Sequence, residues 1–232
     1  PSSFNEIRGN GELFPLNGPM WSLFFEYIGN ILYAIFIRRL STKLLTFVVI
    51  LLGILHSIFT IGNLSGYGNL GVGWTFDTIN FFGGMLRMLF PFTLGMLIFR
   101  RFKAIKLPYP FLICSILLIA TLSMPYLSAF KTINLNGIYE SFCITVIFPL
   151  ILIIGASSQE KSKLSQTLGE LSYPLYIIHY PIMYLFYQWL IKTKQYTLSE
   201  TYPVAILVVI LSIVLAFILL KLYDKPLRQR LK

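Results

Sequence analysis

The stretch PVAILVVILSIVLAFILL, residues 203–220, contains no charged side chain and decides the fold class of the protein. A helix of this length extends about 27 Å, which is close to the thickness of the hydrocarbon core of a bilayer. A membrane barrel would instead show alternating polarity in segments of about ten residues. The run therefore predicts a transmembrane α-helix.

The rest of the chain has the same apolar character. Of its 232 residues, 56% are hydrophobic and only 12% are charged, whereas about a quarter are charged in soluble domains. A water-soluble globule is excluded because so few charges leave most of the surface apolar. Seven apolar runs are candidate membrane spans, at residues 20–37, 44–61, 79–99, 107–127, 138–156, 170–191 and 203–221. We expect an all-α, polytopic transmembrane helical bundle with about seven spans.

Basic residues are unequally distributed between the two sides of this bundle. Fourteen of the 19 lysines and arginines follow the first, third, fifth and seventh runs, four lie on the opposite side, and Arg87 lies within a run. Lysine and arginine accumulate in cytoplasmic loops. We therefore expect a multi-pass protein of the inner (cytoplasmic) cell membrane, with its N-terminal end outside and its C-terminus in the cytoplasm. The same rule explains the net charge of +10 without a nucleic-acid partner.

The first apolar run carries a stripe of polar residues. Ser22, Glu26, Asn30 and Tyr33 recur at helical spacing and so share one face. A glutamate in hydrocarbon costs several kcal/mol unless it is paired, protonated or exposed to water, so the stripe is expected to face the bundle interior. Glu26 is a candidate functional residue, and a buried salt bridge or a neutral acid is the structural alternative.

Arg87 lies near the middle of the third run, on the same face as Gly84, Pro91 and Gly95. Small residues on this face let a neighbouring helix approach closely. Arg87 and Glu26 have similar depths in their runs, which makes an ion pair between them geometrically possible. The arginine is either a structural partner or an anchor for a carboxylate, a phosphate or an oxyanion.

The sixth run combines His179 with several tyrosines, including Tyr173 and Tyr176, and with two prolines, Pro174 and Pro181. Proline frees backbone carbonyls and bends a helix. The tyrosine hydroxyls are candidates to line a sugar-binding or acyl-binding cavity, although tyrosine is also common at membrane interfaces. A single histidine in a membrane helix is more often a packing residue than a general base.

Other segments carry weaker signals. The glycine-rich connection 62–80 has no lysine or arginine, so it is not a phosphate loop and is interpreted as an outer-surface loop. Cys114 and Cys143 lie in apolar runs and are expected to be buried packing residues. His56 is a weaker candidate than His179. No paired histidine or cysteine spacing suggests a metal site.

Four segments, in this order along the chain, resemble the acyltransferase-3 family of bacterial integral membrane acyltransferases. They are NGPMWSLFFEYIGNILYAIF (17–36), with its W-S-L-x-x-E core, GGMLRMLFPFTLGMLIFR (83–100), LGELSYPLYIIHYP (168–181) and YDKPLRQRL (223–231). The resemblance implies about ten membrane helices and the transfer of an acyl group, usually acetyl from acetyl-CoA, to hydroxyls of surface carbohydrates. Acyl-CoA is then a donor substrate rather than a bound cofactor, and a surface polysaccharide or lipid-linked glycan is the acceptor.

The resemblance also assigns candidate site residues. Glu26 of the W-S-L-x-x-E core, Arg87 of the arginine-containing helix and His179 are the candidate catalytic residues. Trp21 and Ser22 of the same core are candidate substrate-binding residues. Independently of the resemblance, the polar stripe adds Asn30 and Tyr33 as candidate substrate-binding residues, and the tyrosine-rich sixth run adds Tyr173 and Tyr176. Besides these substrates, the expected partner is membrane lipid, and no metal is expected.

In the family, the presumed catalytic histidine lies in helices upstream of the W-S-L-x-x-E core, and no residues here correspond to it. Three further spans would bring seven to ten and would agree with a Pro1 placed outside. Residues 1–232 are therefore predicted to be a single membrane-embedded acyltransferase domain, as a C-terminal fragment that is inactive alone. The alternatives are a transporter or flippase of a lipid-linked sugar, and an inactive truncated remnant.

Overall fold

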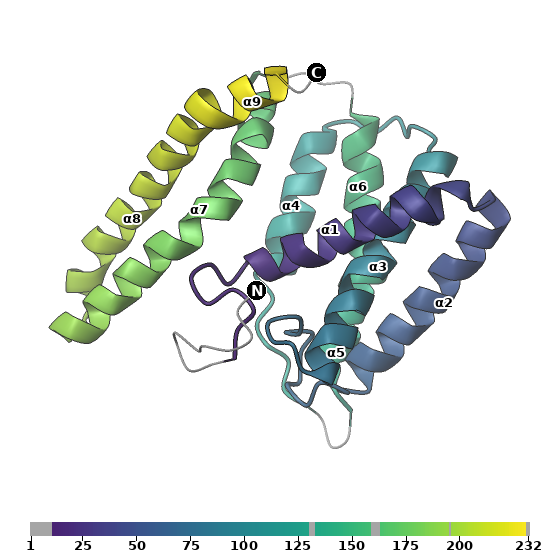
Figure 1. The fold of residues 1–232 in the computed structure, drawn as a ribbon, viewed down its shortest axis with the longest axis horizontal. Coiled ribbons are helices and arrows are strands. Elements are labelled where there is room, and N and C mark those ends of the chain that lie inside the picture. The colour runs from purple at the N-terminus through teal and green to yellow at the C-terminus, as the bar shows by residue number, and fades with distance from the viewer. Residues whose placement is uncertain (1–10, 130–132, 159–162, 195, 231–232) are drawn as a thin grey trace. The chain divides into compact units, whose positions relative to one another are not determined.

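A computed structural model describes residues 11–129, 133–158, 163–194 and 196–230, and these residues form an all-helical structure (Figure 1). Apart from the helices, an isolated antiparallel bridge joins Glu12 to Thr75. The predicted all-α fold is confirmed.

The helices coincide with the seven predicted runs. They are α1 (Met20–Ile35), α2 (Thr42–Ile61), α3 (Thr78–Arg101), α4 (Pro110–Leu122), α5 (Leu135–Phe142), α6 (Phe148–Ser157), α7 (Lys163–Thr193), α8 (Leu198–Leu219) and α9 (Lys225–Arg230), with a 3-10 turn η1 (Ile37–Arg39) and π-helical turns η2 (Cys143–Ile147) and η3 (Leu220–Asp224). The π-helical turns join α5 to α6 and α8 to α9, so each set forms one continuous helical segment.

Four of these segments are long and apolar enough to cross a membrane, namely α2, α3, the α5 to α6 segment and the α8 to α9 segment. With 16 residues, α1 is shorter than a full span, and so is α4 with 13, because a span needs about 20 residues. The α7 helix is long, with 31 residues, but it carries more polar side chains. The protein is therefore a helical membrane protein, and four of its seven predicted spans meet both criteria.

Each π-helical turn precedes a proline. Pro149 follows η2 and Pro226 follows η3. A proline ring in a regular helix collides with the carbonyl group four residues earlier and removes one hydrogen bond. A π turn widens the helix at this point and moves the carbonyl aside. Both segments therefore continue as helices through their prolines.

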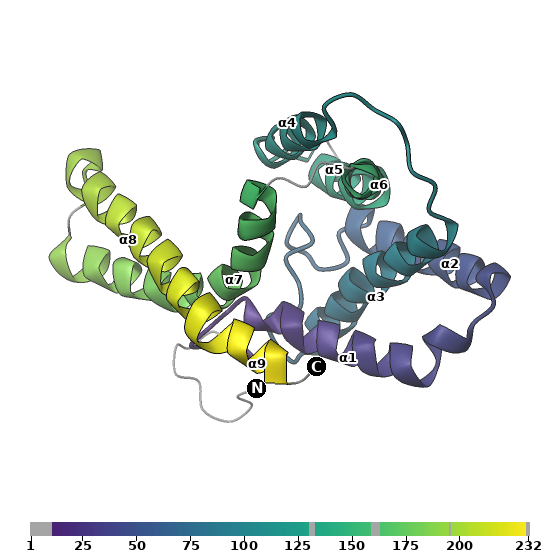
Figure 2. The same ribbon diagram turned by 90° about the horizontal axis from the view of Figure 1, so that it is seen from above.

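The chain forms two compact units. The first contains Pro1–Leu13 and Trp21–Gln159, and the second contains Phe14–Met20 and Glu160–Lys232. In the first, α1 packs on α3 through a face formed by Trp21, Phe25 and Gly29. In the second, α7 and α8 lie side by side (Figures 1 and 2).

Close packing of α1 on α3 depends on Gly84. A Cβ atom at this position would lie 2.6 Å from ring atoms of Phe25 and 3.0 Å from the Cα atom of Gly73. The side chain of Phe25 is fully buried, so it has little room to move. The prediction that small residues on this face of α3 permit close approach is confirmed at Gly84, whereas a Cβ atom at Gly95 would have no neighbour within 4 Å in the part of the chain that the structure describes.

We expect Gly84→Ala to lower the free energy of unfolding by about 1–3 kcal/mol, because overpacking forces the Phe25 ring or the α3 backbone to shift. Gly95→Ala is the matched control, since it adds the same methyl group to the same helix where space is open and helix propensity improves. Thermal unfolding of the detergent-solubilised variants measures both. An equal loss of stability in the two variants would contradict the packing argument.

In the second unit, a proline of α7 creates a binding point for the segment before α1. Because Pro181 has no N–H group, the carbonyl of Ile177 four residues earlier loses its helical partner. The Asn17 side chain donates to this carbonyl over 2.8 Å, and the Tyr176 hydroxyl donates to the carbonyl of Pro19 over 2.8 Å. The α7 helix remains continuous at both of its prolines. The segment before α1 therefore binds alongside an uninterrupted helix.

The N-terminal part of α7 is held by an ion pair. The Lys225 ammonium group of α9 lies 2.8 Å from the Glu170 carboxylate of α7. A second ion pair, within the η3 to α9 segment, joins Arg228 to Asp224 at 3.0 Å. Both pairs are partly exposed, so they fix geometry more than they stabilise the fold.

Candidate functional site

The clearest polar site in the first unit contains Arg87 of α3 and Trp21 of α1. The Arg87 guanidinium carbon lies 4.4 Å from the centre of the Trp21 ring, and its Nη1 atom donates to the carbonyl of Val72 over 3.2 Å. Trp21 is 9% exposed and also contacts Trp74, at 5.8 Å between ring centres. An aromatic ring below a guanidinium fixes its plane and attracts its charge.

The connection between α2 and α3 covers this pair. Gly73 has φ +106°, and a Cβ atom there would lie 2.6 Å from the Trp21 ring, so only glycine allows the backbone to approach so closely. The Gly73 N–H donates to Asn80 Oδ1 over 3.0 Å, and Asn80 in turn donates to Asp77 from its backbone and side chain. The Thr75 hydroxyl also donates to Asp77. Hydrogen bonds from Thr75 and Asn80 hold the pKa of the Asp77 carboxyl below its ordinary value.

Arg87 lines two different cavities beside α3. The first has a volume of 400 Å³ and is bounded by α3, α4, the α5 to α6 segment and residues 69–71. The second has a volume of 280 Å³ and runs between α3 and the η2 to α6 segment, where Pro91 and Gly95 face Pro149. Arg87, Ile144 and Phe148 line both cavities. The guanidinium group is therefore positioned to contact a ligand that enters either one.

The 400 Å³ cavity contains an acidic residue that sequence reasoning missed. Glu140 lines its wall and accepts hydrogen bonds from the Leu70 backbone N–H, at 2.7 Å, and from Asn136 Nδ2, at 3.1 Å. A signal was present, because Asn136 and Glu140 are spaced four residues apart beside a strongly apolar run. The glycine-rich connection was interpreted only as an outer-surface loop, yet it supplies the backbone that holds both Glu140 and Arg87.

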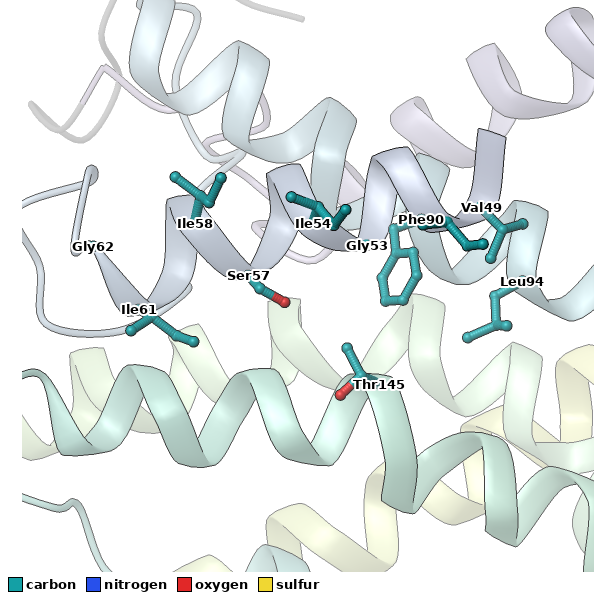
Figure 3. Close-up of a pocket in the computed structure, with 11 residues that line it drawn as sticks. Val49, Gly53, Ile54, Ser57, Ile58, Ile61, Gly62, Phe90, Leu94 and Thr145 are labelled. Carbon is teal, nitrogen blue, oxygen red and sulfur yellow. The ribbon is translucent and has the colours of Figure 1, made fainter. Parts of the chain in front are cut away.

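A larger cavity of 660 Å³ lies between α2, α3 and η2 (Figure 3). Figure 3 shows Ser57 and Thr145 pointing into it from opposite helices. The Ser57 hydroxyl accepts from Ser141 Oγ over 3.0 Å, and the Thr145 hydroxyl donates to the Ser141 carbonyl over 2.7 Å. Of the described residues that line the cavity, none is charged. It suits hydrocarbon better than a polar reactant.

The polar stripe of α1 is placed differently from the expectation. Glu26, Asn30 and Tyr33 are exposed, whereas the neighbouring face with Trp21 and Phe25 is buried. Among the described residues, no ion pair joins Glu26 to Arg87, because the aromatic face of α1 turns toward α3 and carries Glu26 away. The ion pair that their similar depths made possible is therefore not formed in this part of the chain. Ser22 is half-buried, and the predicted roles of these four residues stay predictions.

His179 lies in a separate cavity of the second unit, with a volume of 470 Å³, between α7 and α8. Its Nδ1 atom lies 3.0 Å from the Leu175 carbonyl and 2.9 Å from the Tyr176 carbonyl. These contacts assign the proton to Nδ1 and leave Nε2 as an acceptor. The Tyr176 ring lies 6.0 Å from the imidazole, whereas Tyr173 is exposed. The structure thus brings Tyr176 and His179 together and leaves Tyr173 outside.

The other histidine and the cysteines agree with packing roles. His56 is fully buried beside Phe90, at 5.4 Å between ring centres, and in the described ranges neither of its ring nitrogens has a hydrogen-bond partner. Cys114 and Cys143 are free thiols, half-buried and buried respectively. Packing by these side chains was predicted.

These features define a helical membrane protein in which one arginine, Arg87, lines two cavities between apolar helices. The acyltransferase domain family Acyl_transf_3 matches residues 2–221, so the chain belongs to this family. No curated protein and no solved structure matches the chain. Family membership confirms the resemblance seen in the sequence and identifies the class of activity as acyl transfer at a membrane.

Proposed function

We propose that the protein is an O-acyltransferase of the cytoplasmic membrane that moves an acetyl group from acetyl-CoA to a hydroxyl of a surface polysaccharide or lipid-linked glycan. The observation that carries this proposal is the Arg87 guanidinium, which lies on the Trp21 ring at 4.4 Å and lines two cavities. Membership of an acyltransferase family supports the reaction class. The distribution of basic residues supports a cytoplasmic C-terminus.

The chemistry explains why a fixed guanidinium is useful. The acceptor hydroxyl oxygen attacks the thioester carbonyl carbon, and a new C–O bond forms while the C–S bond breaks. The hydroxyl proton passes to a base, coenzyme A leaves as a thiolate that takes up a proton, and negative charge develops transiently on the carbonyl oxygen. Arg87 would donate to that oxygen, and donors that are fixed in advance stabilise such charge most effectively.

The remaining candidate residues have supporting roles in this proposal. Trp21 orients Arg87 by the contact described above. His179 offers Nε2 as a hydrogen-bond acceptor in its own cavity, where Tyr176 is its neighbour. Glu26, with Ser22, Asn30 and Tyr33, provides a polar face on α1 that a polar substrate can contact.

The test is transfer of labelled acetyl. Membranes from cells that express the protein from its complete coding sequence are supplied with acetyl-CoA labelled in the acetyl group and with the de-acetylated surface polysaccharide of the same cells. We expect label in an alkali-labile ester on the polysaccharide, with one free thiol released per ester. Membranes without the protein are the control. Movement of a glycan across the membrane without any covalent product would overturn the proposal in favour of a transporter.

A further inference from the structure

Two opposite charges line the 400 Å³ cavity without neutralising each other. Glu140 lies on the α5 side and Arg87 on the α3 side. In the ranges that the structure describes, no ion pair joins them. The segment Leu70–Val72 separates them, because the Leu70 N–H donates to Glu140 over 2.7 Å and the Val72 carbonyl accepts from Arg87 over 3.2 Å. Backbone groups of this segment thus hold the Glu140 carboxylate and the Arg87 guanidinium in place.

The position of Glu140 is fixed by a second layer of contacts. Asn136 donates both to Glu140 Oε1, at 3.1 Å, and to the Gly68 carbonyl, at 3.3 Å. Asn136 is 5% exposed, so this bridge between α5 and the glycine-rich connection is shielded from solvent. A carboxylate has about four acceptor sites on its two oxygens. Two of them bind protein groups, and the others remain for a donor in the cavity.

The rest of the lining suits a neutral hydroxylated ligand. Asn69, Thr121 and Tyr139 add polar groups to the wall, and the Tyr139 hydroxyl is itself anchored on the Thr121 carbonyl at 2.8 Å. Leu122 and Phe148 supply apolar surface. Because one carboxylate and one guanidinium balance in charge, the cavity does not select an anion or a cation. Its volume is in the range of small-molecule sites.

We propose that this cavity binds the hydroxyl-bearing carbohydrate unit of the acceptor, and that Glu140 accepts a hydrogen bond from the hydroxyl that is acylated. The proposal rests on the acyltransferase function proposed above and adds the site of the acceptor to it. Glu140 orients the hydroxyl, while Arg87, which lines the same cavity from α3, donates to the carbonyl oxygen of the donor. The loop segment Leu70–Val72 sets the separation between these two positions.

The experiment measures acceptor and donor kinetics separately in membranes that contain the protein expressed from its complete coding sequence. The substrates are labelled acetyl-CoA and the de-acetylated surface polysaccharide. In Glu140→Gln, we expect the KM for the polysaccharide to rise about 10- to 100-fold, because a hydrogen bond to a charged group is lost. The KM for acetyl-CoA should stay within about twofold of the wild-type value. Glu200→Gln is the matched control, since Glu200 binds Thr197 at the start of α8 and is not among the residues that line this cavity, and it should leave both constants unchanged.

Thr121→Trp keeps the inference falsifiable if Glu140→Gln fails to fold, because it fills the cavity without removing either charge. It should raise the acceptor KM in the same way and spare the donor KM. An unchanged acceptor KM in a folded Glu140→Gln or Thr121→Trp variant would overturn the inference while the proposed function stands. A wild-type protein that transfers no label would overturn the proposed function first, and the inference with it.

Discussion

Arg87→Ala is expected to lower the rate of acetyl transfer at saturating substrate by about 10²- to 10³-fold, the effect of removing one donor to a developing oxyanion. The guanidinium group is held on Trp21 and on the Val72 carbonyl, so little reorganisation is needed when charge develops. The variant should still insert and fold, because Phe25, Gly29 and Gly84 make the main contact between α1 and α3. Initial rates with labelled acetyl-CoA, normalised to folded protein, measure the effect.

Two further variants separate charge from geometry at this position. Arg87→Lys keeps the positive charge but loses the planar group that lies on the Trp21 ring, so it should recover only a small part of the lost rate. Arg101→Ala removes an exposed arginine from the end of the same helix and should leave the rate unchanged. Normal turnover in Arg87→Ala would reduce Arg87 to a packing residue.

The positions of the helices were predictable from the sequence because transfer into lipid depends on local composition. The charge-free run 203–220 lies within one helical segment of the structure, α8 and η3. The polar breaks between runs likewise correspond to the ends of helices. Two runs are longer than their helices. The run that begins at residue 20 contains α1, which ends at Ile35 and is followed by the 3-10 turn with Arg38 and Arg39, and the run 107–127 contains the 13 residues of α4.

The rotation of α1 about its own axis was not predictable in the same way. The helix has two faces with equally regular spacing, one with Ser22 and Glu26 and one with Trp21 and Phe25. The second face packs because Gly84 admits the Phe25 ring at a distance that no larger residue permits. That steric fit joins residues far apart in the chain. Similar depth in the membrane left an ion pair between Arg87 and Glu26 open, whereas the contact that forms is with the Trp21 ring.

Glu140 shows a different limit of sequence reading. The argument that selected Glu26, an acid within an apolar run, applies equally to Glu140 near the start of the run 138–156. What makes Glu140 noteworthy is the backbone N–H of Leu70, a partner 70 positions away. No residue type signals such a contact, because every residue other than proline carries the same N–H group. Only the fold of the glycine-rich connection brings it to the carboxylate.

Trp21→Ala is expected to lower the free energy of unfolding by about 3–5 kcal/mol, because it removes a large buried ring and leaves a cavity. The ring is 9% exposed and packs against Phe25 and Trp74, at 6.1 and 5.8 Å between ring centres. Trp21→Phe should cost much less, since a smaller aromatic ring still fills part of the space and still faces the guanidinium. Thermal unfolding of the detergent-solubilised variants provides the measurement.

A double-mutant cycle with Arg87→Ala then isolates the contact between the ring and the guanidinium. We expect a coupling free energy of about 0.5–2 kcal/mol, the range for a cation over an aromatic face. The single variants should also share a functional effect, because an arginine without its aromatic support loses the orientation that transfer requires. Trp21→Phe should therefore retain more activity than Trp21→Ala. This difference in activity should be larger than the difference in the fraction of folded protein would cause. A coupling near zero would show that Trp21 contributes packing only, and that the Val72 carbonyl fixes Arg87 without it.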